Sequence, residues 1–115
     1  MTASSSTDLL QPPAVRRIFF ERRELTRILS AYGRGVAAGD WRDYAMDPLT
    51  DRALFSIYRR AHETPLYQIE KRPDLARKQG EWSILSGHGL VLKRGRDLEA
   101  LLRFFDRQRF ALIAD

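Results

Sequence analysis

Arginines spaced for one face of a helix are the first feature of this chain that could do chemistry. Arg23, Arg27 and Arg34 fall within about 40° of one another on a helical wheel, and the nearby carboxylate of Glu24 lies off this stripe. Arg27 and Arg34 would stand roughly 10 Å apart along the axis, a spacing suited to successive backbone phosphates. The pattern predicts an anion-binding face. Its alternative is a solvated face in a chain that has 17 arginines and 3 lysines.

A second group of basic side chains lies in a predicted β-hairpin and in the segment after it, together with one tyrosine. The residues are Tyr58, Arg59, Arg60, Lys71, Arg72, Arg77 and Lys78. If Phe55, Ile57, Tyr67 and Ile69 face the core, Tyr58 shares the opposite face of the sheet with basic side chains. An aromatic ring beside guanidinium groups suits base stacking combined with phosphate contact on RNA. The alternative is a half-exposed tyrosine that packs against arginine stems.

Other kinds of chemistry have little support in the residue types. The chain has no Cys, which excludes disulfides, thiolate metal sites and a thiol nucleophile, and its 2 His leave almost nothing for imidazole chemistry. Four aspartates lie close together in the sequence: Asp40, Asp43, Asp47 and Asp51. They lack the spacing of an EF-hand, so an acidic loop that pairs with nearby arginines is the simpler interpretation. We therefore expect no metal and no cofactor, and an enzyme acting on an anionic substrate is the third and last functional hypothesis.

Two helices are predicted to hold these groups in place. The first covers residues 22–38, with Gly39 as its stop. Its apolar residues recur at helical spacing and form one stripe: Leu25, Ile28, Leu29, Tyr32 and Val36. The second helix follows Asp97, a suitable N-cap. Its apolar residues also have helical spacing: Leu98, Leu101, Leu102 and Phe105.

Between the helices the pattern changes to the alternation of β-strands. Candidate strands cover about residues 40–47, 53–60, 66–72, 82–86 and 90–93, and residues 16–20 form a further edge strand or lead into the first helix. We predict an α+β fold, a single two-layer domain whose antiparallel sheet of four to five strands carries both helices on one face. The order is α-β-β-β-β(-β)-α. The other face of the sheet would be open to solvent or to a partner.

The 115 residues suffice for one domain, which we place at residues 15–115. Residues 1–14 are rich in serine and proline and are predicted to be a mobile tail. The tail lacks the basic and apolar regions of a secretory signal, and no apolar run is long enough to span a membrane. We expect a cytoplasmic protein with no membrane partner.

Four sequence blocks carry a resemblance to a known family: RRIFFERREL, AAGDWRDYAMD, FSIYRRAHETPLYQIEKRPDLARKQGEWSI and GLVLKRGRDLEALL. They resemble a family of short alphaproteobacterial proteins catalogued as a domain of unknown function. The resemblance extends from about Arg16 to Phe105. It implies a bacterial cytosolic setting and brings no activity, ligand or catalytic residue with it.

The charge balance directs the functional hypotheses toward anions. The net charge is +5 and the isoelectric point is near 10.1. The leading hypothesis is a small non-enzymatic module that binds RNA, DNA or a ribonucleoprotein through its arginine-rich surfaces. The alternative is a protein-interaction or regulatory adaptor, or a homodimer, that uses the open face of the sheet. Salt dependence separates them, because binding dominated by phosphates weakens steeply with added salt.

Overall fold

A computed structural model of the chain describes residues 16–60 and 63–114, with side chains described as far as Arg109. The predicted mobile tail, residues 1–14, lies outside the described residues. The elements follow in the order α2 (Arg22–Ala37), β1 (Asp43–Pro48), β2 (Ala53–Tyr58), β3 (Tyr67–Lys71), η1 (Pro73–Leu75), β4 (Trp82–Ser86), β5 (Val91–Gly95) and α3 (Leu98–Ala114). The element η1 is a single turn of 3₁₀ helix.

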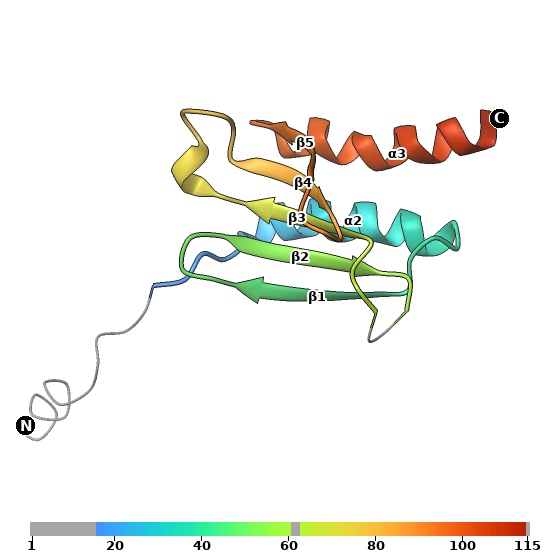
Figure 1. Cartoon of the computed structure of the whole chain (residues 1–115), viewed down its shortest axis with the longest axis horizontal. Coiled ribbons are helices and arrows are strands. Elements are labelled where there is room, and N and C mark those ends of the chain that lie inside the picture. Colours follow the sequence, from blue (N-terminus) through green and yellow to red (C-terminus); the bar gives the residue numbers. More distant parts are fainter. Residues whose placement is uncertain (1–15, 61–62, 115) are drawn as a thin grey trace, which may run out of the picture.

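The five strands form one antiparallel sheet in which each strand pairs with its neighbour along the chain (Figure 1). Ile28 of α2 and Leu101 of α3 pack in one buried cluster with sheet residues such as Phe55. Both helices therefore cover the same face, and the predicted α+β fold is confirmed. Residues 16–20 are extended but form no strand, although the Ile18 N–H donates a hydrogen bond to the Leu49 carbonyl oxygen at 2.7 Å.

Local signals set both ends of α2. The backbone N–H of Glu21 donates to Oε1 of Glu24 at 2.8 Å, and this contact is one half of a reciprocal capping box. At the other end the chain leaves the helix at Gly39, whose φ of 81° is the left-handed conformation that favours glycine. Helix α3 begins in a similar way, because Oδ2 of Asp97 accepts a hydrogen bond from the Ala100 N–H at 3.2 Å.

The buried side of α2 differs from the predicted stripe. Ile28 is buried as expected, but Val36 is 44% exposed while Ala31 and Gly35 are buried. A Cβ atom at Gly35 would overlap the indole ring of Trp41, so only glycine allows that ring to pack against the helix. The prediction that Val36 belongs to the buried stripe is wrong. Ala31 and Gly35 take part in the buried side because small residues permit close packing, but they add little to a hydrophobic pattern in the sequence.

The two faces of the β2–β3 hairpin are as predicted. Phe55, Ile57 and Ile69 are buried beneath the helices, while Tyr58 is half-buried on the opposite, outer face. The middle of this outer face is less open than expected, because the short side chain of Ser56 is buried there and accepts a hydrogen bond from Gln68 at 3.0 Å. Glu70 and Ser83 are buried on the same face. The outer face is therefore closed at its centre, where Leu85 is also buried beside these polar side chains.

Candidate functional site

Two of the three predicted helix arginines face carboxylates of the other helix. Nε of Arg27 lies 3.5 Å from Oε1 of Glu99, and Nε of Arg34 lies 3.5 Å from Oδ1 of Asp106. The two pairs are seven residues apart on each helix, so α2 and α3 run side by side in the same direction (Figure 1). The structure thus places Arg27 and Arg34 along the junction of the two helices.

A shallow groove of about 130 Å³ lies at this junction, and we call it the helix groove. Its lining residues are Arg27, Ser30, Arg34, Glu99, Leu102 and Arg103. Exposed Arg107 follows Arg103 by one helical turn, and exposed Arg23 precedes Arg27 by one turn. Five arginines against the carboxylates of Glu99 and Asp106 leave a net charge of +3 along this surface.

The basic residues of the β2–β3 hairpin do not form one cluster. Tyr67 is the register partner of Ile57, and Lys71 is the partner of Ala53 at the far end of β2. Arg59 and Arg60 follow the other end of β2, so the length of the strand, roughly 17 Å, separates them from Lys71. The hairpin therefore presents two basic sites at opposite ends of the sheet.

Lys71 points toward the helices and is only 8% exposed. Its Nζ atom donates hydrogen bonds to Oε1 of Glu24 at 2.8 Å and to the carbonyl oxygen of Phe19 at 3.0 Å. The same ammonium group lies 5.9 Å from the centre of the Trp82 ring, within range of a cation–π contact. Lys71 is thus occupied by protein groups, a finding that removes it from the surface on which the sequence pattern had placed it.

The neighbourhood of Lys71 contains another carboxylate with a perturbed pKa. Burial raises the pKa of Glu81 above its ordinary value, and the charges of Glu24 and Glu21 raise it further. The positive charge of Lys71 acts in the opposite direction. Lys71 therefore interacts with Glu81 as well as with its hydrogen-bond partner Glu24.

Arg72 is also engaged by acidic side chains. One of its Nη2 contacts is with Oδ2 of Asp74 at 3.2 Å, and the other is with Oδ2 of Asp51 at 3.8 Å. Arg52 joins the same network, because it binds Asp51 at 3.0 Å and the buried carboxylate of Glu70 at 2.7 Å. The hydrogen bond from Arg52 holds the pKa of Asp51 below its ordinary value.

The remaining predicted residues are scattered over the surface. Tyr58 lies opposite Asp43 in the sheet register, so a carboxylate is its cross-strand neighbour. Arg60 is exposed beyond the end of β2. Arg77 and Lys78 are exposed after η1, at the same end of the hairpin as Lys71.

Arg59 reaches a second hollow that the sequence pattern did not indicate. This aromatic hollow of about 230 Å³ lies where the α2–β1 connection, the start of β3 and α3 meet. Trp41, Tyr67 and Phe105 form its walls and contact one another edge to face, with ring centroids 4.9 to 6.3 Å apart. Residues far apart in the sequence thus build one aromatic surface.

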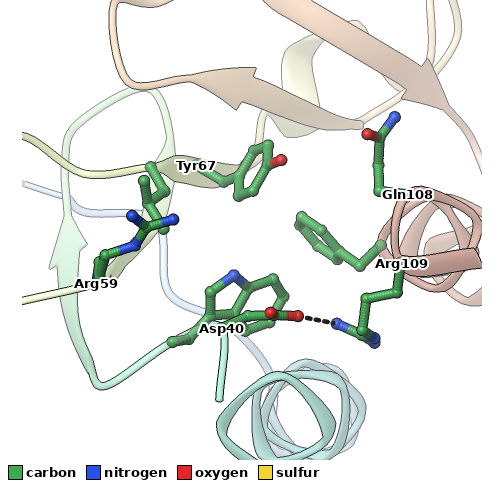
Figure 2. A pocket seen from close by; sticks show the side chains of 8 residues that line it. Asp40, Arg59, Tyr67, Gln108 and Arg109 are labelled. Atoms are coloured by element: carbon green, nitrogen blue, oxygen red, sulfur yellow. Dashed lines mark ion pairs between the residues drawn. The ribbon is translucent and has the colours of Figure 1, made fainter. Parts of the chain in front are cut away.

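Charged side chains stand around the aromatic hollow. Figure 2 shows Arg59 on one side and Gln108 and Arg109 of α3 on the opposite side. Arg109 is held in place by Asp40 at 3.5 Å and by Asp106 at 2.7 Å, and its guanidinium lies 5.7 Å from the centre of the Trp41 ring. Within residues 16–60 and 63–114, Arg59 forms no ion pair.

The described residues offer neither a metal-binding cluster nor a membrane-spanning helix. Among the described residues, no three His, Cys, Asp or Glu side chains come together in a way that could hold a metal ion. Asp43 and Asp47 lie on β1, while Asp40 and Asp51 pair with different arginines. No helix in the described part of the chain has the length and apolar character needed to cross a membrane.

Comparison with known proteins gives a family but no activity. Residues 18–102 match the model of a family described as "Protein of unknown function (DUF2794)". The chain belongs to the DUF2794 family. No curated protein and no solved structure matches it.

The DUF2794 match covers only part of the helix groove and part of the aromatic hollow. It includes α2 and all five strands, and it ends at residue 102 within the first turns of α3. Arg103 of the helix groove and Phe105, Gln108 and Arg109 of the aromatic hollow follow the matched segment directly. The arginines of α2 and Arg59 lie inside it.

The sequence interpretation of this DUF2794 domain missed Arg103 and Arg107. The spacing of residues 98–114 indicates them, because Arg103 and Arg107 are separated by one helical turn and lie on the polar side of α3. No comparable signal marks the aromatic hollow. Its residues come from four separate segments, and only their packing brings them together.

Proposed function

We propose that this DUF2794 domain binds nucleic acid along the helix groove, with backbone phosphates on the guanidinium groups of α2 and α3. The observation that carries the proposal is the alignment of Arg27, Arg34 and Arg103 from two helices along one groove. Guanidinium groups bind phosphate oxygens through pairs of parallel N–H donors. Exposed Arg23 and Arg107 extend the same surface in both directions.

The ion pairs within the groove are compatible with phosphate binding. The side chains of Arg27 and Glu99 are 44% and 60% exposed, and those of Arg34 and Asp106 are 51% and 41% exposed. Exposed pairs of this kind contribute only about 0–1 kcal/mol, so a phosphate can replace a carboxylate at little cost. The carboxylates also orient the guanidinium groups toward the groove. A bacterial cytoplasmic setting is part of the proposal, because the resemblance of the sequence blocks implies it.

The test is the salt dependence of oligonucleotide binding by a triple variant, Arg27→Gln with Arg34→Gln and Arg103→Gln. Fluorescence anisotropy of a labelled single-stranded RNA, repeated over a range of KCl concentrations, gives the slope of log K against log salt. The slope is negative, and each lost phosphate contact should make it shallower by about 0.7 for a single strand and by about 0.9 for duplex DNA. Glutamine keeps the side chain as far as Cδ and a polar end, and these three side chains are not part of the buried core, so the fold should be retained.

A matched control removes the same charge elsewhere. The variant Arg60→Gln with Arg77→Gln and Lys78→Gln loses three exposed positive charges outside the groove. It should bind more weakly by a small factor and keep the slope of the wild-type protein. Equal slopes in the two triple variants would mean that net charge, and not the groove, attracts the oligonucleotide. A wild-type protein that binds no oligonucleotide at low salt would end the proposal.

A protein-binding adaptor is the second candidate, and β5 favours it because β4 is its only sheet partner among the described residues. Leu90, Val91 and Leu92 are 70%, 50% and 41% exposed, and Lys93 and Arg94 follow them on this edge strand. An edge strand offers unpaired backbone groups to which an extended segment can add. Charge complementarity indicates that such a segment would be acidic and rich in leucine.

A peptide titration tests this second candidate. A synthetic extended peptide in which leucine and glutamate alternate should shift the backbone amide signals of Val91–Gly95 in an NMR spectrum. The Leu92→Lys variant should lose the response, whereas Leu49→Lys, near the opposite edge of the sheet, should keep it. If the peptide shifts no amide signal of Val91–Gly95, the hypothesis that β5 binds an acidic, leucine-rich segment is contradicted. Self-association in sedimentation, abolished by Leu92→Lys, would instead identify a second copy of the chain as the occupant.

A further inference from the structure

The aromatic hollow has the features of a small-molecule site that is separate from the helix groove. We propose that it binds one planar aromatic group carrying a single adjacent anionic group, of which a nucleoside monophosphate is an example. The ring would lie against Tyr67, and the anionic group would accept hydrogen bonds from Arg59. The hollow would bind this ligand whether or not the groove binds nucleic acid.

The size of the hollow limits the ligand. Sites for drug-sized molecules usually enclose about 300–1,000 Å³, and this hollow measures about 230 Å³. One base or one substituted aromatic ring fits such a volume, with the remainder of the ligand extending into solvent. A dinucleotide cofactor does not fit.

The aromatic walls offer one accessible ring. Trp41 and Phe105 are 4% and 2% exposed, so these two walls offer little ring surface to a ligand. Tyr67 is only half-buried, and its three aromatic contacts in the described part of the chain are all edge to face. No other ring stacks in parallel on Tyr67 there, so this side chain can receive the face of a ligand ring.

The charges of the hollow select an anion. Arg59 and Arg109 contribute two positive charges and Asp40 one negative charge, which leaves +1 among the lining residues. Arg109 is already held by Asp40 and Asp106. Arg59, which has no such partner among the described residues, reaches the hollow from the side opposite α3 (Figure 2). The anionic group of a ligand, about −1.5 to −2 for a phosphate monoester at pH 7, would offset this positive charge, and Gln108 adds an uncharged hydrogen-bonding group.

The two tryptophans provide a reporter and an internal control without any substitution. Trp41 lines the hollow, and Trp82 lies beside Lys71 and Phe20 outside it. Titration of the full chain with AMP, followed by the two indole N–H signals in an NMR spectrum, should shift the Trp41 signal and leave the Trp82 signal in place. Adenosine and ribose 5-phosphate, which each lack one half of the ligand, should bind at least about tenfold more weakly than AMP.

A pair of neighbouring arginines provides the decisive comparison. Arg59→Gln removes the free cation of the hollow and should weaken AMP binding by roughly tenfold to a hundredfold, the value of a charge-assisted hydrogen bond. Arg60→Gln removes the adjacent exposed charge, which does not line the hollow, and should change the affinity by less than about twofold. A Trp41 signal that ignores AMP, or equal losses in the two variants, would overturn the proposal.

Competition identifies the source of the ligand. If a short oligoadenylate displaces AMP from the hollow, the natural ligand is a nucleotide within a strand. If the oligoadenylate does not displace AMP, the natural ligand is a free mononucleotide or aromatic acid. The triple variant of the helix groove should bind AMP as the wild-type protein does. Loss of AMP binding in that variant would show that the hollow is not an independent site.

Discussion

The two ends of the β2–β3 hairpin carry the same kind of sequence and have different physical roles. Arg59 and Arg60 stand at one end, and Lys71 and Arg72 at the other. Lys71 is buried between Glu24 and the Trp82 ring, and Arg72 joins a network of carboxylates. Arg59 and Arg60 are exposed, and neither has an ion pair within the described residues. A pair of basic residues therefore indicates a binding surface only when acidic groups are absent from its surroundings.

Removal of Lys71 should have the largest effect on stability. Lys71→Ala leaves the largely buried carboxylate of Glu24 with the Glu21 N–H but without its charged partner, and breaking a buried ion pair in this way costs about 3 kcal/mol. Chemical denaturation should show this loss, whereas Arg60→Ala should leave the midpoint nearly unchanged. The double variant Lys71→Met with Glu24→Gln should recover most of the loss, because it removes both charges. Equal stability of Lys71→Ala and Arg60→Ala would erase the contrast between the two ends.

The next effect concerns Arg52, which supports the same end of the hairpin. Glu70 is 4% exposed and accepts a hydrogen bond from Arg52 at 2.7 Å. Arg52→Ala should destabilise the protein by about 2 kcal/mol, since a buried carboxylate loses its charged partner. Asp51→Asn alters the exposed side of the same network and serves as the comparison in the thermal unfolding experiment. A larger loss for Asp51→Asn than for Arg52→Ala would show that Glu70 does not depend on this arginine.

A pH-dependent difference should distinguish Glu81 at the Lys71 end. Burial raises the pKa of Glu81 in the folded state, so folding favours its protonated form. The stability contributed by this group is full below the ordinary glutamate pKa and declines as pH rises through the raised folded value. Glu81→Gln should therefore match the wild-type melting temperature in acid and exceed it near neutral pH. Parallel melting curves of the two proteins across the whole range would contradict the assignment.

The smallest effect is expected at the free end. Arg59→Gln and Arg60→Gln, alone or together, should change the free energy of unfolding by less than about 0.5 kcal/mol, as is usual for exposed side chains. Their melting temperatures should match that of the wild-type protein within error. A clear destabilisation by Arg59→Gln would mean that this side chain has a structural partner, and the aromatic hollow would lose its free cation.

The helices, the strands and the inner face of the hairpin could be predicted because their signals are local. Apolar residues at helical spacing mark α2, and Gly39 marks its end where the structure requires a positive φ. Alternation in residues 53–58 and 67–71 determines which side chains of the hairpin are buried, since neighbouring residues of a strand face opposite sides. Arg23, Arg27 and Arg34 are all exposed on α2, and their shared stripe follows from helical spacing.

The sequence by itself determined which residues share a helix stripe or a strand face, because these relations depend on backbone geometry over a few residues. Only the tertiary structure decided which charges meet. Lys71 binds Glu24 across 47 positions of the chain, and Arg27 meets Glu99 of the other helix. Such contacts depend on how whole elements pack, and a residue type carries no record of a partner so distant. For the same reason the walls of the aromatic hollow, Trp41, Tyr67 and Phe105, became visible as one site only when the sheet and α3 were in place.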